Sequence, residues 1–168
     1  MQLLNVIAPT QTLSVNDIGC GYGALAGFMH RRLRGVAIDY LGTDLSPEMI
    51  ALARRKNRRR SVCFEQGPGA RRLADYSLAS GIFNVRLHHP LDVWEAFVAR
   101  ALTDMANTSR IGFAVNFLAP APQDPTQLYR ADASFWVEYC RTRLDMQTQL
   151  LQDYGMREFT LLARRIPR

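Results

Sequence analysis

The sequence predicts an α/β fold in which helices flank a mixed sheet of seven strands. Short apolar runs typical of buried strands alternate with segments whose apolar residues recur every three or four positions, as in helices. A glycine-rich turn directly follows the first of these runs, as expected between a strand and a helix. The last two runs lie too close together for a helix to connect them. They favour an antiparallel hairpin that closes the sheet.

The expected elements follow from this pattern in chain order. Strands are expected at residues 13–18, 37–43, 61–66, 76–82, 111–118, 147–151 and 158–163. Helices are expected at 24–33, from Ser46-Pro47 onward, over Leu91 to Met105, and over Phe135 to Leu144. Ser46 is a favourable N-cap and Pro47 suits the first helical position. The proline-rich segment 119–125 is expected as a loop at the carboxyl edge of the sheet, where α/β folds bind ligands.

The bulk composition is that of one soluble globular domain spanning residues 1–168. Apolar residues make up 48% of the chain and charged residues 21%. Its apolar stretches fall short of the roughly 18 residues that span a bilayer, and the N-terminal segment lacks the basic flank and cleavage site of a signal peptide. These features predict a cytoplasmic protein that is not in a membrane, and they leave its oligomeric state open.

The three cysteines, Cys20, Cys63 and Cys140, are widely spaced. Without a CxxC pair or a Cys/His cluster, they indicate neither a zinc site nor a disulfide framework. We therefore expect reduced thiols used in packing, and no metal site.

The net charge of +6 is concentrated in one basic run. It consists of Arg54, Arg55, Lys56, Arg58, Arg59 and Arg60. Such a run can neutralise phosphates of RNA or DNA. It is also typical of a solvated helix end, where cations suit the negative pole of the helix dipole. Because no aromatic residues interleave with the run to stack on bases, the second interpretation is favoured.

The glycine-rich turn reads Asp17-Ile18-Gly19-Cys20-Gly21-Tyr22-Gly23. Its glycines allow a sharp turn and close approach of a ligand, and the following helix presents free N–H groups suited to a carboxylate or a phosphate. Asp17 adds an acceptor for an ammonium group, directly or through water. Asp44, 25 residues after Gly19, ends the second strand and can accept both hydroxyls of a ribose. This combination suits S-adenosylmethionine.

A dinucleotide is the competing ligand, because Gly19-x-Gly21-x-x-Ala24 also satisfies a loosened nicotinamide-cofactor fingerprint. Three features disfavour it. The charge of Asp17 would repel a pyrophosphate. Gly23 is not explained by the dinucleotide pattern, and the terminal hairpin replaces the second mononucleotide-binding half that such folds need.

The glycine turn, together with the segment 42–49, resembles the class I S-adenosylmethionine-dependent methyltransferases, and in particular small bacterial methyltransferase domain proteins. The similarity extends through segments 80–85, 139–140 and 153–155. It implies a three-layer Rossmann-like methyltransferase fold, with S-adenosylmethionine as the cofactor and S-adenosylhomocysteine as the product. The residues that the resemblance assigns to the cofactor are Asp17, Gly19, Cys20, Gly21, Tyr22, Gly23, Asp44, Leu45, Met49, Gly67, Pro68, Ser80, Gly81, Ile82 and Phe83.

The resemblance also implies which part of the cofactor each of these residues would contact. Asp17 and the glycines would hold the methionine moiety. Asp44 would bind the ribose, with Leu45 and Met49 near the adenosine. The turn 67–69 would pass the edge of the adenine, and residues 80–83 would face the methyl group.

The methyl acceptor is less well indicated. Methyl transfer needs alignment and exclusion of water, and a general base only where the acceptor holds its proton tightly. The fourth strand lacks the Asn/Asp-Pro-Pro-aromatic motif of nucleic-acid amino methylation, and no Pro-Cys pair offers a nucleophile for pyrimidines. Asn84 and Tyr129 are candidates for acceptor contacts or for structural roles. His88 and His89 could supply a general base near the site, or they could be two solvent-exposed residues of a loop.

Only sixteen residues precede Asp17, where related domains usually carry helices that cover the cofactor. This predicts an open site, for which the loop 119–131 is the remaining cover. A small-molecule methyltransferase is the leading hypothesis. RNA methylation through the basic run and a non-catalytic S-adenosylmethionine-binding module are the alternatives.

Overall fold

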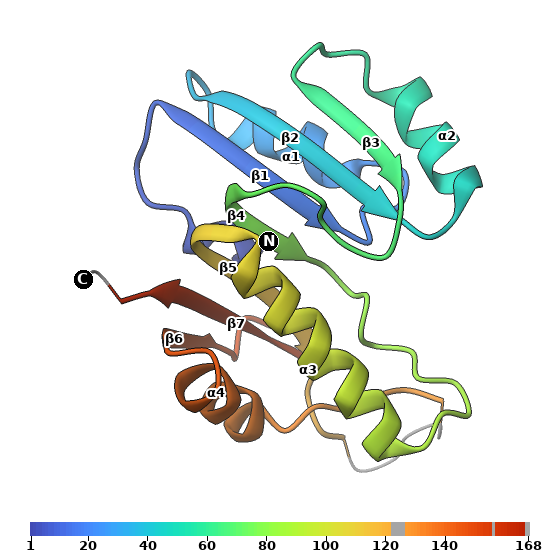
Figure 1. The fold of residues 1–168 in the computed structure, drawn as a ribbon, viewed down its shortest axis with the longest axis vertical. Coiled ribbons are helices and arrows are strands. Elements are labelled where there is room, and N and C mark those ends of the chain that lie inside the picture. Colours follow the sequence, from blue (N-terminus) through green and yellow to red (C-terminus); the bar gives the residue numbers. More distant parts are fainter. Residues whose placement is uncertain (122–126, 156, 167–168) are drawn as a thin grey trace.

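The structure is a computed structural model that describes residues 1–121, 127–155 and 157–166. Its seven strands form one sheet in the order β3-β2-β1-β4-β5-β7-β6, and β7 runs antiparallel to both of its neighbours. The predicted mixed seven-stranded sheet with a terminal hairpin is therefore confirmed (Figure 1). Residues 122–125 of the predicted proline-rich loop lie outside the described residues.

The strands are β1 (Thr12–Ile18), β2 (Ala37–Asp44), β3 (Val62–Gln66), β4 (Ala74–Ala79), β5 (Ser109–Leu118), β6 (Met146–Leu151) and β7 (Glu158–Arg165). The helices are α1 (Ala24–Arg32), α2 (Pro47–Lys56), α3 (Leu91–Asn107) and α4 (Ala133–Thr142), preceded by a 3-10 helix, η1 (Gln2–Val6). The predicted fourth strand, 76–82, is wrong at its end. β4 stops at Ala79, and Gly81 then adopts a φ of 74°, which a strand does not allow.

The sheet separates two apolar layers, as Figure 1 shows with α1 behind the sheet and α3 in front of it. On one side, η1, α1 and α2 pack on a core that includes Val15, Tyr40 and Ile50. On the other side, α3 and α4 pack on a core that includes Phe113 and Trp136. Alternate residues of the central strands serve opposite layers, so β1 and β4 contribute to both.

The helix η1 was not predicted, because five residues are too few to show a helical period. Its side chains Leu3, Leu4 and Val6 are buried against β5 and β7. Arg164 of β7 holds its backbone by donating from Nη2 to the carbonyl of Asn5 (2.6 Å) and from Nε to that of Val6 (3.0 Å). The N-terminal segment therefore lies on the sheet.

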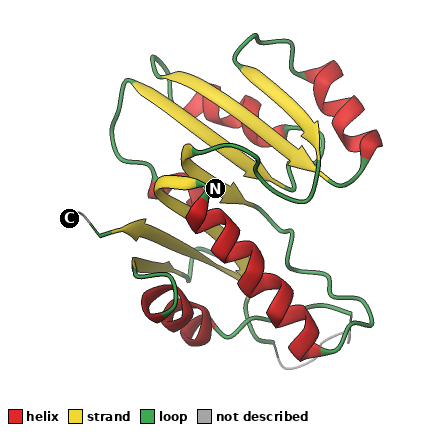
Figure 2. Cartoon of the chain, in the orientation of Figure 1, coloured by secondary structure: helices red, strands yellow, loops and turns green. Residues whose placement is uncertain are grey.

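Residues 67–73, here called the strap, lead from β3 to β4 without a helix, and Figure 2 shows them as a loop. Arg72 fastens the strap by donating to the Asp39 carboxylate (2.7 Å) and to the Val15 carbonyl (3.2 Å). On β3, Val62 and Phe64 are buried whereas Cys63 between them is exposed. The prediction that all three cysteines are used in packing is thus wrong for Cys63. Its side chain lies on the face of β3 opposite to Val62 and Phe64, and no helix between β3 and β4 covers that face.

Within the ranges that the structure describes, no helix is both long enough and apolar enough to cross a membrane.

Candidate cofactor-binding site

The glycine loop, residues 19–23, joins the carboxyl end of β1 to α1. Gly19, Gly21 and Gly23 all have positive φ values, of 70°, 52° and 78°. A Cβ added to Gly19 would lie 2.1 Å from Ile82 Cγ2, and one on Gly23 would lie 2.6 Å from the Phe64 ring. Nothing lies within 4 Å of a Cβ on Gly21, so the loop is closely packed on two sides and open at its middle glycine.

Asp44, at the end of β2, fastens the open part of this loop. Its Oδ2 accepts from the amide of Gly21 (2.9 Å) and its Oδ1 accepts from the amide of Ser46 (2.9 Å). One carboxylate thereby joins the glycine loop to the start of α2. Each oxygen keeps a second lone pair, so the hydroxyls of a ribose can still donate to it.

Asp17, the last residue but one of β1, lies beneath the loop and is only 2% exposed. Its carboxylate accepts a hydrogen bond from the hydroxyl of Tyr40. Burial raises the pKa of Asp17 to about 7; the hydrogen bond from Tyr40 opposes this shift, and the charge of Asp44 adds to it. Sequence reasoning missed Tyr40, whose only signal was a phenol hydroxyl in the middle of an expected strand.

Cys20 and Tyr22 occupy the positions between the glycines. Cys20 is buried, and burial followed by the nearby Asp17 and Asp44 charges raises the pKa of its thiol to about 12. A thiol that stays protonated acts as a packing group. Tyr22 is exposed, and the Lys56 ammonium lies 4.3 Å from its ring centroid.

Two apolar side chains flank Asp44 on the solvent side, where the resemblance places the adenosine. Leu45 is 69% exposed and Met49 is 40% exposed, although both are apolar. The strap begins beside them, because the amide of Gly67 donates to the Asp44 carbonyl (3.0 Å). Pro68 is exposed next to it. Uncovered apolar groups at one spot suit a flat apolar ligand surface such as adenine.

The loop after β4 divides into an outer and an inner part. Ser80 is exposed, and the amide of Gly81 donates to Asn116 Oδ1 (2.7 Å). Ile82 packs against the glycine loop at Gly19. Phe83, by contrast, is fully buried, with its ring stacked at 5.6 Å on Phe117. Of the four residues expected to face the methyl group, Phe83 therefore has its side chain in the core.

The two residues suggested for acceptor contacts are both inside. Tyr129 is buried, and its hydroxyl accepts from Trp136 Nε1 (2.8 Å) and donates to Glu95 (3.2 Å). Asn84 is half-buried, and the structure describes no partner for its Oδ1. The backbone carbonyl of Asn84 accepts from the amide of Tyr129 (2.9 Å), so the pair joins two segments of chain. These contacts favour the structural interpretation of Tyr129.

His88 and His89 are both exposed, and the ring of His89 stacks on Trp94 at 6.1 Å. Their positions fit a hydrated loop pair.

The basic run contributes partly to the fold. Arg54 donates to the carbonyl of Phe64 from both Nε (3.1 Å) and Nη2 (2.7 Å), which ties α2 to β3. Residues 58–60 are exposed and precede the amino end of β3. The glycine loop follows the carboxyl end of β1, at the opposite end of the parallel strands.

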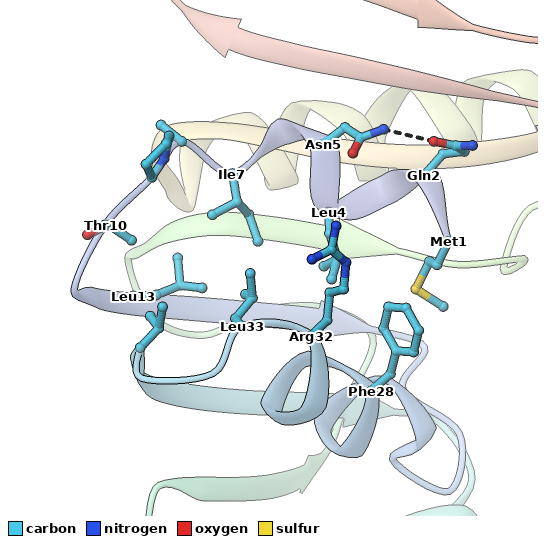
Figure 3. A pocket seen from close by; sticks show the side chains of 13 residues that line it. Met1, Gln2, Leu4, Asn5, Ile7, Thr10, Leu13, Phe28, Arg32 and Leu33 are labelled. Atoms are coloured by element: carbon cyan, nitrogen blue, oxygen red, sulfur yellow. Dashed lines mark hydrogen bonds between the residues drawn. The ribbon is translucent and has the colours of Figure 1, made fainter.

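Two cavities lie beside η1. The larger, of about 670 Å³, separates it from α1. Figure 3 shows Phe28 and Arg32 of α1 facing Leu4 and Ile7 across it. It includes none of the residues predicted to bind the cofactor. The smaller cavity, of about 390 Å³, lies at the ends of β4 and β5 and includes Ser80.

Comparisons with known proteins agree with this arrangement. Residues 15–112 match the family model described as "Methyltransferase domain". The chain is 40% identical to Rv1506c of Mycobacterium tuberculosis, whose name describes it as a methyltransferase. The match covers 98% of this chain and 99% of the relative.

Solved structures share the fold. An S-adenosylmethionine-dependent methyltransferase from Mesorhizobium loti has a TM-score of 0.67 and 18% identity, covering 96% of this chain and 94% of its own. Magnesium protoporphyrin IX methyltransferase from Synechocystis PCC 6803, solved with bound S-adenosylhomocysteine, has a TM-score of 0.71 and 15% identity, covering 92% of this chain and 75% of its own. The sheet order and glycine loop define a Rossmann-like methyltransferase fold. The chain belongs to the methyltransferase domain family.

Proposed function

We propose that this chain transfers the methyl group of S-adenosylmethionine to a small-molecule acceptor. One observation carries the proposal, namely the hydrogen bond from the Gly21 amide to the Asp44 carboxylate (2.9 Å). This contact joins the open glycine backbone to a carboxylate that could accept from ribose hydroxyls. S-adenosylmethionine contains both a methionine carboxylate and a ribose diol, which suit these two groups. Solved neighbours of the same fold hold this cofactor or its product.

The site's residues have chemistry that fits each part of the cofactor. The open side of Gly21, with the free N–H groups at the start of α1, would receive the methionine carboxylate. Asp17 beneath the loop would favour the ammonium group, directly or through water. Asp44 would accept from the ribose hydroxyls, and Leu45 with Met49 would cover the adenine.

The cofactor, when bound, supplies a methyl group already activated by a sulfonium. The protein aligns the acceptor with that carbon and keeps water away from it. Ser80 to Ile82 would form the wall beside the methyl group, since they lie between the glycine loop and the smaller cavity.

The positions of the smaller cavity and of the basic run favour a small acceptor over RNA. The smaller cavity adjoins Ser80, whereas residues 58–60 of the basic run lie at the other end of the strands. If RNA were the acceptor, reversing the charges of Arg58, Arg59 and Arg60 would abolish its salt-sensitive binding. We expect those charge-reversal variants to keep full methyltransferase activity. We also propose that the protein is located in the cytoplasm.

Calorimetric titration with S-adenosylmethionine and S-adenosylhomocysteine tests the cofactor assignment. Asp44→Ala removes both the ribose acceptor and the tie to Gly21, so we expect affinity to fall by about 100-fold, as for a lost charged hydrogen-bond partner. Asp104→Ala is the control, because Asp104 is exposed on α3 and its side chain takes no part in the contacts described for the site.

Failure of both ligands to bind the folded wild-type protein would contradict the proposal. Binding without methyl transfer to any acceptor would instead indicate a non-catalytic S-adenosylmethionine-binding module.

A further inference from the structure

The smaller cavity, beside η1, has both polar and apolar groups in its lining. It lies between the end of β4, the strand β5 and the terminal hairpin, and the start of η1 closes one side of it. Its polar side chains are Gln2, Ser80, Asn116, Tyr154, Glu158 and Thr160. Its volume of about 390 Å³ is near the lower end of the usual range for ligand sites, which suits a small molecule.

Asn116 of β5 connects this cavity to the loop that would face the methyl group. Its Oδ1 accepts from the Gly81 amide (2.7 Å), and its Nδ2 donates to Glu158 Oε2 (2.9 Å). Since both ends of the amide are engaged, its orientation is fixed. The same loop touches the glycine loop through Ile82 and Gly19. It is therefore a wall shared by the donor side and the cavity.

Glu158 is the charged side chain among the residues that line this cavity, and Met1 adds the N-terminal ammonium. It is half-buried at the start of β7, and among the described residues no lysine, arginine or histidine forms an ion pair with it. Its neighbours Tyr154 and Thr160 are hydrogen-bonded to each other (3.0 Å). Burial, with a smaller contribution from the Glu158 charge, raises the pKa of Tyr154, so its hydroxyl stays neutral. A carboxylate held by a neutral amide in this cavity is complementary to a cation.

We infer that this cavity receives the methyl acceptor, that the acceptor is a small amine, and that Glu158 binds its nitrogen and takes its proton. The inference rests on the proposed function. An ammonium group transfers one proton to the Glu158 carboxylate, which frees the lone pair on nitrogen. That pair attacks the methyl carbon, a C–N bond forms, and the C–S bond breaks with its electrons passing to sulfur. The products are a methylammonium and a neutral thioether, and Glu158 then releases its proton to water.

The acceptor class is tested with methyl-labelled S-adenosylmethionine and a bacterial small-molecule extract. A cation-exchange resin divides the extract into a retained cationic fraction and a flow-through of neutral and anionic compounds. We expect the wild-type protein to label compounds of the cationic fraction. Label confined to the flow-through, or no label in either fraction while S-adenosylhomocysteine still binds, would overturn the inference.

The role of Glu158 is tested with two variants and a control. Glu158→Gln keeps the side chain's size and an oxygen for Asn116 but removes the charge, and it should lower kcat/KM on the cationic fraction by about 100-fold or more. Glu158→Asp keeps the charge and should recover part of that loss. Glu138→Gln, on the exposed surface of α4, should leave the rate unchanged.

Calorimetry separates this inference from the proposed function. All three variants should bind S-adenosylhomocysteine within about twofold of the wild type, because the glycine loop and Asp44 are intact. If the wild-type protein does not bind S-adenosylhomocysteine, the proposed function itself is contradicted. Normal cofactor binding with full methyl transfer by Glu158→Gln would defeat only the role of Glu158. Thermal unfolding of each variant shows that it is folded, and the result of the fractionation does not depend on any substitution.

Discussion

At the scale of single residues, the unusual feature is a buried acid beneath the glycine loop. Asp17 is nearly inaccessible, has the hydroxyl of Tyr40 as its partner, and has a pKa raised to about 7. A buried carboxyl that ionises near neutral pH reduces stability when its charge forms without a counter-ion. The approach of a ligand ammonium would offset that cost. Under the proposed function, Asp17 would couple folding stability to occupation of the cofactor site.

This coupling predicts the effect of Asp17→Asn on stability. The folded-state pKa, about 7, lies above the ordinary value of 3.8, so the wild type binds more protons folded than unfolded. Its stability therefore falls as pH rises between those values, by a few kcal/mol at most. Asn has no charge to bury and keeps an oxygen for Tyr40. We expect Asp17→Asn to unfold at higher urea than the wild type at pH 8, with a smaller difference at pH 5.

Urea unfolding of both proteins at the two pH values measures the effect, with Asp104→Asn as the control at an exposed site on α3. An equal difference at pH 5 and pH 8 would show that Asp17 has an ordinary pKa.

Among the elements, the short helix η1 depends most visibly on tertiary packing. It has five residues, yet three of them are buried, and it forms part of the walls of both cavities beside it. No capping side chain stabilises it, so packing and the contacts of Arg164 hold it in place. Short helices have little stability of their own. The shape of the proposed acceptor cavity therefore depends on the packing of η1.

Truncation of one buried side chain tests this dependence. Leu3→Ala should reduce the free energy of unfolding by about 2–5 kcal/mol, the usual cost of removing a buried leucine side chain. Asn5→Ala is a control in the same helix, because Asn5 is exposed and its side chain donates one hydrogen bond, to the exposed side chain of its neighbour Gln2. Urea unfolding monitored by circular dichroism measures both variants. Equal small effects would mean that η1 is not packed on the sheet.

At the scale of the whole molecule, one sheet joins the two apolar layers. The central strands place alternate side chains in each layer, so neither layer can lose its packing without exposing the strands of the other. Both tryptophans, Trp94 and Trp136, belong to the layer of α3 and α4. Their fluorescence therefore reports directly on that layer, whereas circular dichroism reports on all elements.

This arrangement predicts a single unfolding transition. Fluorescence and circular dichroism should give the same urea midpoint, as expected for two-state unfolding of a chain of this size. Leu3→Ala lies in the opposite layer, yet it should shift the fluorescence midpoint as far as the circular dichroism midpoint. Separate midpoints would show that the layers unfold independently.

Local patterns in the sequence were enough to predict several features of this protein. Apolar periodicity located the strands and helices, and the short spacing before Glu158 indicated the antiparallel hairpin. The glycine turn with Asp44 indicated the cofactor, because each of its requirements involves only a few neighbouring residues. The end of β4 was misplaced because Ser80-Gly81-Ile82 continues an apolar run, while the backbone turns at Gly81.

The contacts between residues far apart in the chain could be found only from the folded structure. Tyr40 reaches Asp17 from a neighbouring strand, Phe83 turns into the core, and Tyr129 is enclosed by Trp136 and Glu95. Asn116 brings Glu158 to the loop after β4, although 42 positions separate the two residues in the chain. Such contacts depend on strand order and register. Those are set by the packing of the whole sheet, and no short stretch of sequence encodes them.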